Sequence, residues 1–108
     1  MKVNRFELKW VGPIHNGFAR VKRRDGMWNF IDKDDELLCK DKWFRYVFDF
    51  EDGFAVIQNE YGMENFIRQD GKLLLKKWHE SAERFKDGFG RVFVDGKCHM
   101  VNAHGKVF

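Results

Sequence analysis

The hexapeptide NGFARV at residues 16–21 returns as DGFAVI at residues 52–57 and as DGFGRV at residues 87–92. The copies lie 36 and then 35 residues apart. A fixed period of this size is typical of repeat proteins, in which one supersecondary unit cannot bury its own apolar face and packs against its neighbours. We therefore expect a single repeat domain over residues 1–108.

The similarity extends beyond the hexapeptide and sets the phase of the repeats. GMWNFI at residues 26–31 matches GMENFI at 62–67 and, more loosely, GKCHMV at 96–101. If each repeat is taken to begin at the glycine of the hexapeptide, four units are predicted. They are a partial N-terminal unit at 1–16, repeat 1 at 17–52, repeat 2 at 53–87 and a partial repeat 3 at 88–108.

Within each unit the apolar residues follow a period of two, which indicates β-strands. After the repeated glycine, a small residue and a β-branched residue share one side of the first strand. These pairs are Ala19 with Val21, Ala55 with Ile57, and Gly90 with Val92. We assign this face to the core. The large rings on the opposite face, Phe18, Phe54 and Phe89, predict that this face is partly covered as well.

Glycines separate the strands at equivalent positions of the repeats. Gly26, Gly62 and Gly96 are expected to adopt positive φ in hairpin turns, and the Asp-Gly pairs at 25–26 and 95–96 are the strongest such signals. A second turn then leads to a third strand near residues 36–38, 72–74 and 106–108. The connector at residues 43–50 alternates like a strand, whereas residues 77–85 are compatible with a strand or with one or two helical turns.

These patterns predict an all-β fold of tandem three-stranded β-meander repeats of about 35 residues, arranged as an open stack. The alternative is a closed barrel- or propeller-like arrangement. Residues 6–10 resemble the third strand of an earlier repeat, and in the closed arrangement this N-terminal strand would complete the last repeat by pairing beside its hairpin.

The charge distribution argues against a nucleic-acid-binding surface. The net charge of +3 comes from 20 basic and 17 acidic residues that are mixed along the chain, so no strong field of one sign is expected. The basic runs at residues 22–24 and 76–77 are explained as solvated strand edges protected by lysine and arginine. Nucleic-acid binding is therefore ranked third, after the binding of a protein or peptide and the binding of a carbohydrate.

The sequence also bears on the compartment. No apolar run approaches the roughly 20 residues of a membrane helix, and the first residues are not followed by the apolar stretch of a secretory signal. Cys39 and Cys98 fall at non-equivalent repeat positions and are interpreted as free thiols in a reducing environment. We expect a cytoplasmic protein without a membrane span, and the alternative is a mature or trimmed piece of an exported protein.

The sequences FARV at residues 18–21, DGMWNFID at 25–32 and Leu-Leu at 37–38 resemble the bacterial WG-containing repeats, also called KWG repeats. The resemblance covers about residues 14–108. It departs at the signature itself, because Trp28 is followed by Asn29 where the family usually has Gly. The other copies carry Glu64-Asn65 and Cys98-His99 at this place. The resemblance implies an all-β repeat protein and supplies no catalytic residues.

The residues themselves predict no catalytic site, no cofactor and no bound metal. Cys98, His99 and His104 are close in sequence, but they lack a convincing ligand spacing, and adjacent strand residues point to opposite faces. The aspartates occupy turn positions, where their side chains satisfy local backbone amides. No phosphate-binding glycine loop and no GxSxG motif occurs. We expect a non-enzymatic interaction or ligand-binding module.

Trp10, Trp43 and Trp78 are the candidates for a binding surface. They lie in the connectors, and repeated aromatic positions on a β scaffold offer a large contact area at low entropic cost. Arg45 and His79 lie nearby in sequence and would orient a ligand. A protein or peptide is the expected partner, and a carbohydrate or cell-envelope glycan is the alternative. The competing explanation places the rings in the core between repeats, and solvent exposure distinguishes the two.

Overall fold

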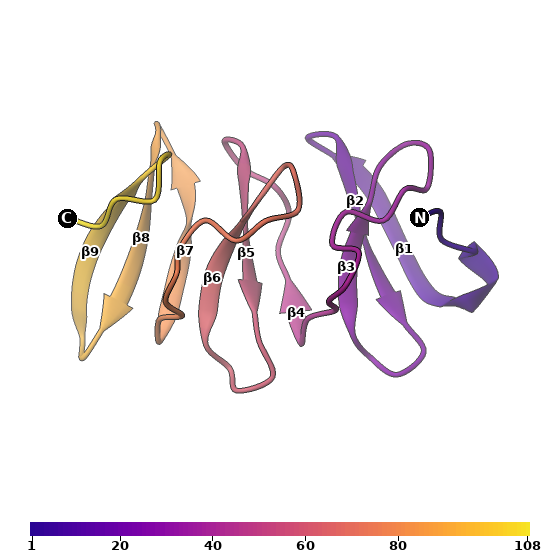
Figure 1. The fold of residues 1–108 in the computed structure, drawn as a ribbon, viewed down its shortest axis with the longest axis horizontal. Coiled ribbons are helices and arrows are strands. Elements are labelled where there is room, and N and C mark those ends of the chain that lie inside the picture. Colours follow the sequence, from indigo (N-terminus) through magenta and orange to yellow (C-terminus); the bar gives the residue numbers. More distant parts are fainter.

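The computed structural model describes residues 1–108, and nine strands form three antiparallel sheets of three strands each (Figure 1). The strands are β1 (Leu8–His15), β2 (Phe18–Arg23) and β3 (Trp28–Ile31) in the first sheet, β4 (Tyr46–Val47), β5 (Phe54–Gln58) and β6 (Glu64–Arg68) in the second, and β7 (Ser81–Lys86), β8 (Phe89–Val94) and β9 (Lys97–Asn102) in the third. A short 3-10 helix, η1 (Arg5–Glu7), precedes β1.

The three sheets form an open stack. They follow one another along the longest dimension of the molecule, which measures 42 × 26 × 20 Å, and the two termini lie at opposite ends (Figure 1). The first strand, β1, pairs with β2 and not with the last repeat. The prediction of an open stack is therefore confirmed. The closed alternative is wrong, because successive sheets step along one axis and do not return to the start.

The repeated Asx-Gly pair forms the turn between the first two strands of each sheet. Both residues have positive φ at Asn16-Gly17 (51° and 92°), and the same holds for the pairs at 52–53 and 87–88. A two-residue hairpin turn of this kind requires residues that tolerate positive φ, as Asn, Asp and Gly do. The hexapeptide that defines the repeat thus begins with a hairpin turn and continues into β2, β5 or β8.

The predicted hairpin glycines behave as expected. Gly26, Gly62 and Gly96 have φ values of 91°, 80° and 75°. In the last hairpin Asp95 also adopts positive φ, at 51°, so both turn residues are left-handed. The equivalent Asp25 does not adopt positive φ, and its carboxylate instead accepts a hydrogen bond from the Met27 N–H at 3.1 Å. The first hairpin therefore uses a longer turn than the sequence suggested.

The Gly96→Val variant isolates the backbone cost of such a turn. A Cβ atom at Gly96 would meet no other atom within 4 Å, so only the positive φ opposes a side chain there. We expect the free energy of unfolding to fall by about 1–3 kcal/mol in a urea titration, because β-branched residues rarely adopt this conformation. A matched Val94→Ala change at an exposed strand position should stay within about 0.5 kcal/mol. Equal costs for the two variants would contradict the turn assignment.

The third strand of each sheet is not the one expected from the sequence. Residues 36–38, 72–74 and 106–108 form only single bridges to the preceding strands. The connector before the repeated glycine supplies the strand instead, as β1, β4 and β7. The strand predicted within the first connector is confirmed for Tyr46–Val47. The helical alternative for the second connector is wrong, because hydrogen bonding to β8 outweighs local propensity over Ser81–Lys86.

The predicted core face is buried in all three sheets. Ala19, Val21, Ala55, Ile57, Gly90 and Val92 are all buried. On the opposite face Phe18 and Phe54 are half-buried between neighbouring sheets, whereas Phe89 is exposed on the last sheet. Each interior face is thus covered by the next sheet. We call the contact between the first and second sheets the first junction, and that between the second and third sheets the second junction.

Two buried asparagines occupy the position at which the resemblance departed from the WG signature. The side-chain amide of Asn65 donates to the Leu75 carbonyl oxygen at 2.9 Å. Its carbonyl oxygen accepts from the backbone N–H groups of Phe66, at 2.7 Å, and Leu75, at 3.2 Å. Asn29 makes the equivalent bonds with Cys39. Each asparagine therefore fastens the segment that follows the second turn to its own sheet.

The last repeat has His99 at this position. Its ring Nδ1 lies 3.0 Å from the carbonyl oxygen of Phe108, so a different side chain fastens the equivalent segment. Asn29, Asn65 and His99, which stand where the signature has glycine, therefore each contact the backbone of the segment that follows the second turn.

Candidate functional site

The three candidate tryptophans do not form one surface. Trp10 has an exposed fraction of 40%, whereas Trp43 and Trp78 are half-buried. Trp43 packs against the core cluster at the N-terminal end, with the Arg23 guanidinium 4.4 Å from its ring centroid. Trp78 packs against the first junction, with the Lys42 ammonium 5.8 Å from its ring centroid. Trp43 and Trp78 therefore cover different parts of the core, and only Trp10 presents a large ring surface to solvent.

Arg45 and His79 lie at sheet edges. Arg45 is exposed, and its backbone N–H donates to the Gln58 carbonyl oxygen at 3.1 Å. His79 is half-buried and exchanges two backbone hydrogen bonds with Glu64. Burial holds the pKa of the His79 imidazole below its ordinary value, and its Nδ1 has no hydrogen-bond partner. Burial therefore disfavours the charged form of this ring.

An aromatic cluster that the sequence analysis did not identify crosses the first junction. It consists of Trp10, Trp28, Tyr46 and Phe48, whose successive ring centroids lie 5.5, 4.9 and 4.9 Å apart in edge-to-face contacts. Gly12 makes room for it, because a Cβ atom there would lie 2.5 Å from the Trp10 ring. Phe48, with an exposed fraction of 45%, forms the end of the cluster nearest the second junction.

The Arg20 side chain lies against this cluster, where it contacts three aromatic rings, a hydroxyl and a carboxylate. Its guanidinium carbon is between 5.5 and 5.8 Å from the ring centroids of Trp10, Trp28 and Tyr46. The guanidinium donates to the Tyr46 hydroxyl at 2.9 Å, and its Nε lies 3.1 Å from an Asp49 carboxylate oxygen. A cation over aromatic faces with a paired carboxylate is stabilising. The cluster therefore already contains its own cation, and it is not a vacant cage for a cationic ligand.

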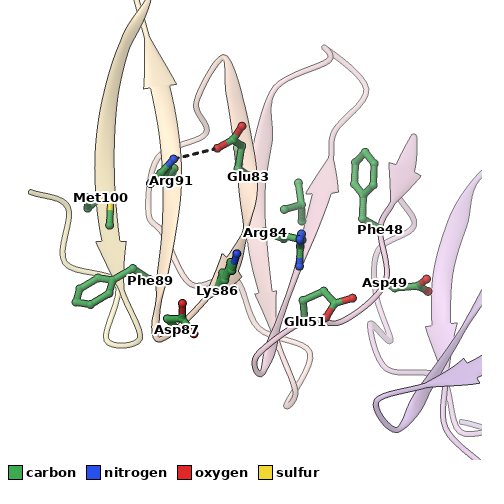
Figure 2. A pocket seen from close by; sticks show the side chains of 12 residues that line it. Phe48, Asp49, Glu51, Glu83, Arg84, Lys86, Asp87, Phe89, Arg91 and Met100 are labelled. Atoms are coloured by element: carbon green, nitrogen blue, oxygen red, sulfur yellow. Dashed lines mark ion pairs between the residues drawn. The ribbon is translucent and has the colours of Figure 1, made fainter.

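Phe48 also lines an open groove of about 870 Å³ that runs past the second junction to the last sheet (Figure 2). Most of its wall comes from the connector before β5 and from β7 and β8 (Figure 2). The lining residues are Phe48, Asp49, Glu51, Val56, Ala82, Glu83, Arg84, Lys86, Asp87, Phe89, Arg91 and Met100. The groove thus combines apolar side chains with charges of both signs.

Most of the acidic groups in the groove already have partners. Asp49 pairs with Arg20 at 3.1 Å, and Glu51 lies 3.1 Å from the ring of His15. Glu83 lies 3.9 Å from Arg91, as the dashed line in Figure 2 shows. The lining cations Arg84 and Lys86 form no ion pair, and both are exposed on β7. Arg84 and Lys86 are therefore the lining cations without an ion-pair partner, in a groove whose wall carries four acidic and three basic side chains.

A comparison of the two junctions shows why Arg84 is unpaired. Arg84 lies 35 residues after Asp49 and holds the equivalent repeat position. Asp49 faces Arg20 across the first junction, but the position equivalent to Arg20 in the second repeat is Val56. The second junction therefore carries one member of the ion pair with its sign reversed, and the chain supplies no counter-charge.

The side chains form no metal-binding cluster, and the buried cysteine is not activated. No three His, Cys, Asp or Glu residues come together in a way that would hold a metal ion. Burial raises the pKa of the Cys39 thiol to about 12, so this cysteine is not a thiolate nucleophile at neutral pH. The only helix is the short η1, and no helix has the length and apolar character needed to cross a membrane.

The sequence profile of one family, described as WG containing repeat, matches residues 5–28 and 66–98. Together these stretches make up more than half of the chain. The chain belongs to the WG containing repeat family. The resemblance identified from the hexapeptide and its surroundings is therefore confirmed.

Solved structures of similar shape include two computationally designed proteins, Ika4 and Ika8. The crystal structure of Ika4 has a TM-score of 0.54 and 16% identity, and the match covers 94% of this WG repeat chain and 69% of Ika4. For Ika8 the TM-score is 0.48 at 16% identity, with 94% and 35% of the two chains covered. At this identity the likeness to Ika4 shows a shared fold alone. No match was found among curated proteins.

The aromatic cluster escaped the sequence analysis because the repeat phase of Trp10 was misjudged. Trp43 and Trp78 lie ten residues before Gly53 and Gly88, but Trp10 lies seven residues before Gly17. Its equivalent in the second WG repeat is therefore Tyr46 and not Trp43. An alignment of the aromatic residues on the repeated glycines would have paired Trp10 with Tyr46.

Proposed function

We propose that this WG repeat chain is a non-enzymatic binding module that holds an extended polypeptide segment in the groove beside Phe48. The observation that carries the proposal is the combination of an exposed ring at Phe48 with the unpaired cations Arg84 and Lys86. An apolar anchor flanked by charges that a ligand can neutralise gives both affinity and orientation.

The unpaired charge at the second junction indicates the chemistry of the segment. In the first junction the chain fills the equivalent place with a carboxylate and a guanidinium, Asp49 and Arg20. In the second junction the equivalent positions hold Arg84 and Val56, so the carboxylate–guanidinium pair of the first junction is not repeated there. A peptide with an acidic residue next to an apolar one would supply a carboxylate, because guanidinium groups bind carboxylates in charge-assisted hydrogen bonds.

The other two ligand classes fit the groove less well. A neutral glycan stacked on Phe48 and Trp10 would leave Arg84 and Lys86 without a counter-charge. A nucleic acid would neutralise these cations, but its phosphates would also meet the acidic groups of the same groove, among them Glu83 and Asp87. A peptide with one carboxylate brings a single negative charge into this groove, whereas a nucleic acid brings one at every phosphate.

We also propose that the protein acts in the cytoplasm. Both cysteines are free thiols in the structure, and Cys98 is exposed. An exposed free thiol is typical of a reducing compartment.

Random peptides displayed on phage, selected against the purified chain, provide the test. We expect enriched peptides to combine acidic and apolar residues. A synthetic fluorescent copy of one such peptide should bind Phe48→Ser and Arg84→Glu at least tenfold more weakly, which corresponds to about 1.4 kcal/mol, in a polarisation titration.

Matched control variants lie outside the groove. Tyr61→Ser removes an exposed ring and Arg24→Glu reverses an exposed arginine, and neither residue lines the groove. Both should leave the peptide affinity within twofold. Peptides whose binding ignores Phe48→Ser and Arg84→Glu, or a glycan array that enriches ligands when the peptide library does not, would overturn the proposal.

A further inference from the structure

The basic run at residues 76–77 does not lie on a strand edge, contrary to the expectation from the sequence. These residues belong to the connector between β6 and β7, whereas residues 22 and 23 of the other basic run belong to β2. The run on β2 is partly neutralised, because Arg23 pairs with Asp25 at 2.9 Å. Lys76 and Lys77 are exposed and form no ion pair. Protection of a strand edge therefore does not account for them.

Lys42 brings a third positive charge to this place from the preceding connector. Its ammonium lies 5.8 Å from the ring centroid of Trp78, which directly follows Lys76 and Lys77 in the chain. Lys42 is also exposed and has no ion-pair partner. Three lysines without counter-charges thus gather at one half-buried ring. We call Lys42, Lys76, Lys77 and Trp78 the Trp78 patch.

The two connectors that form the patch carry the whole net charge of the chain. The equivalent ranges 40–45 and 75–80 contain five basic and two acidic residues, and the rest of the chain contains 15 of each. One of the two acidic residues is engaged elsewhere, since the Glu80 carboxylate accepts a hydrogen bond from the Asp95 N–H at 2.9 Å. Charges of both signs are balanced over the other residues, but positive charge prevails at the patch.

The titration of His79, the residue after Trp78, also indicates a positive potential here. Burial is the main cause that lowers the pKa of the His79 imidazole, and the charges of His99 and Lys77 lower this pKa further, while a hydrogen bond with the Lys77 backbone opposes them. Neighbouring cations disfavour an additional positive charge and favour an anion. A partner with negative charge therefore fits this surface.

The open shape of the patch favours an extended anionic partner. None of its residues lines the groove beside Phe48 or the smaller cavity of about 420 Å³ near Gly17. Lysine is a compact charge on a flexible stem, and it does not impose the fixed geometry with which arginine binds a single carboxylate or phosphate. The patch thus suits many anionic groups spread over a surface better than one small anion.

The tryptophan rings distinguish between two such surfaces. Single-stranded nucleic acids stack their bases on open aromatic faces. Here Lys42 lies over the Trp78 ring, and Arg23 lies 4.4 Å from the Trp43 ring centroid, so cations already occupy these rings. Tryptophan and lysine are, in contrast, typical residues of the interface between a bilayer and water. The combination favours a lipid surface.

We infer that the Trp78 patch docks this chain on the surface of a bilayer that contains anionic lipids. The three lysines lie among the acidic headgroups, and the exposed part of the Trp78 ring lies at headgroup level, without insertion of a segment into the hydrocarbon. The cytoplasmic leaflet carries anionic lipids, in agreement with the compartment proposed above. The inference is independent of the proposed peptide site, because no patch residue lines the groove.

Cosedimentation of the full chain with vesicles tests the docking. We expect binding to vesicles of three parts phosphatidylcholine and one part phosphatidylserine, and none to vesicles of phosphatidylcholine alone. The partition coefficient should fall at least tenfold between about 0.1 M and 1 M salt, because the Debye length falls from about 10 Å to about 3 Å. Equal binding to both kinds of vesicle, or no binding to either, would overturn the inference.

Charge reversal at the patch tests the location. The double variant Lys42→Glu/Lys77→Glu should lower the partition coefficient at least tenfold and keep the far-UV circular dichroism of the wild type, since both side chains are exposed. Lys9→Glu/Lys33→Glu changes the net charge equally at exposed positions outside the patch and should cost no more than about threefold. Equal losses in the two double variants would show that the overall charge, and not the patch, causes the binding.

Two further titrations separate this site from other ligands. The patch variant should bind the groove peptide with wild-type affinity, so a failure of the peptide site and a failure of the patch give different results. A short DNA duplex in the same salt should bind more weakly than the phosphatidylserine vesicles. A duplex that binds more tightly than these vesicles, and is released by Lys42→Glu/Lys77→Glu, would assign the patch to nucleic acid and overturn the inference.

Discussion

Asn65→Ala is expected to lower the free energy of unfolding by about 4 kcal/mol, a large fraction of the roughly 5–15 kcal/mol that folded domains have. The side chain is fully buried and makes three hydrogen bonds, two of them to the backbone of Leu75. Alanine leaves these backbone groups buried without partners, and each such group costs about 1–3 kcal/mol. Urea unfolding monitored by far-UV circular dichroism measures the loss.

Asn4→Ala is the matched control. Asn4 caps η1 with one hydrogen bond to the Phe6 N–H, at 3.0 Å, and it is exposed. Its loss should cost no more than about 1 kcal/mol. A cost for Asn65→Ala as small as that of the control would show that the buried amide does not hold the following segment in place.

Phe85→Ala should cost about 3–5 kcal/mol, because it opens a cavity at the centre of the second junction. The ring is fully buried, with its centroid 4.2 Å from that of Phe54 and 4.9 Å from that of Phe66. A Cβ atom at Gly90 would lie 2.7 Å from this ring, so the strand beside it is already in tight contact. The last two sheets should therefore separate before the first junction unfolds, which a second transition in the urea curve would reveal.

Phe6→Ala provides the comparison for this variant. Phe6 is among the most exposed large side chains of the molecule and contributes little buried area. Its replacement should change the stability by less than about 0.5 kcal/mol and keep a single transition. If Phe85→Ala unfolds in one transition with a similarly small loss, the second junction does not depend on this ring.

The periodicity of the sequence was sufficient to predict the repeats, the buried face and the glycine turns. Small and β-branched residues alternate at Ala19 and Val21 in the same way as at Ala55 and Ile57, so a single pattern defines two equivalent environments. The third strands were not predictable in the same way. The strand β4 spans only Tyr46–Val47, and its pairing is fixed by the turn at Asp52-Gly53, several residues further along the chain.

The candidate site depends on contacts that a single sequence does not contain. Arg20 meets Asp49 only after two sheets have packed, and the absence of a partner for Arg84 follows from Val56 at the position equivalent to Arg20. The exposure of Phe48 likewise depends on how the second junction is filled. Alternation within residues 43–50 indicated a strand, but it could not show which rings of that strand face solvent.

The arrangement of the strands determines how the molecule responds to mechanical force. The strands run across the long axis, and the chain termini lie at opposite ends of the stack (Figure 1). A pull on the two ends therefore loads the backbone hydrogen bonds of each junction one after another and does not shear them together. The two backbone hydrogen bonds between Glu64 and His79 then bear the force at the second junction. We therefore expect the molecule to lengthen under low force in successive small steps, as one sheet after another separates from its neighbour.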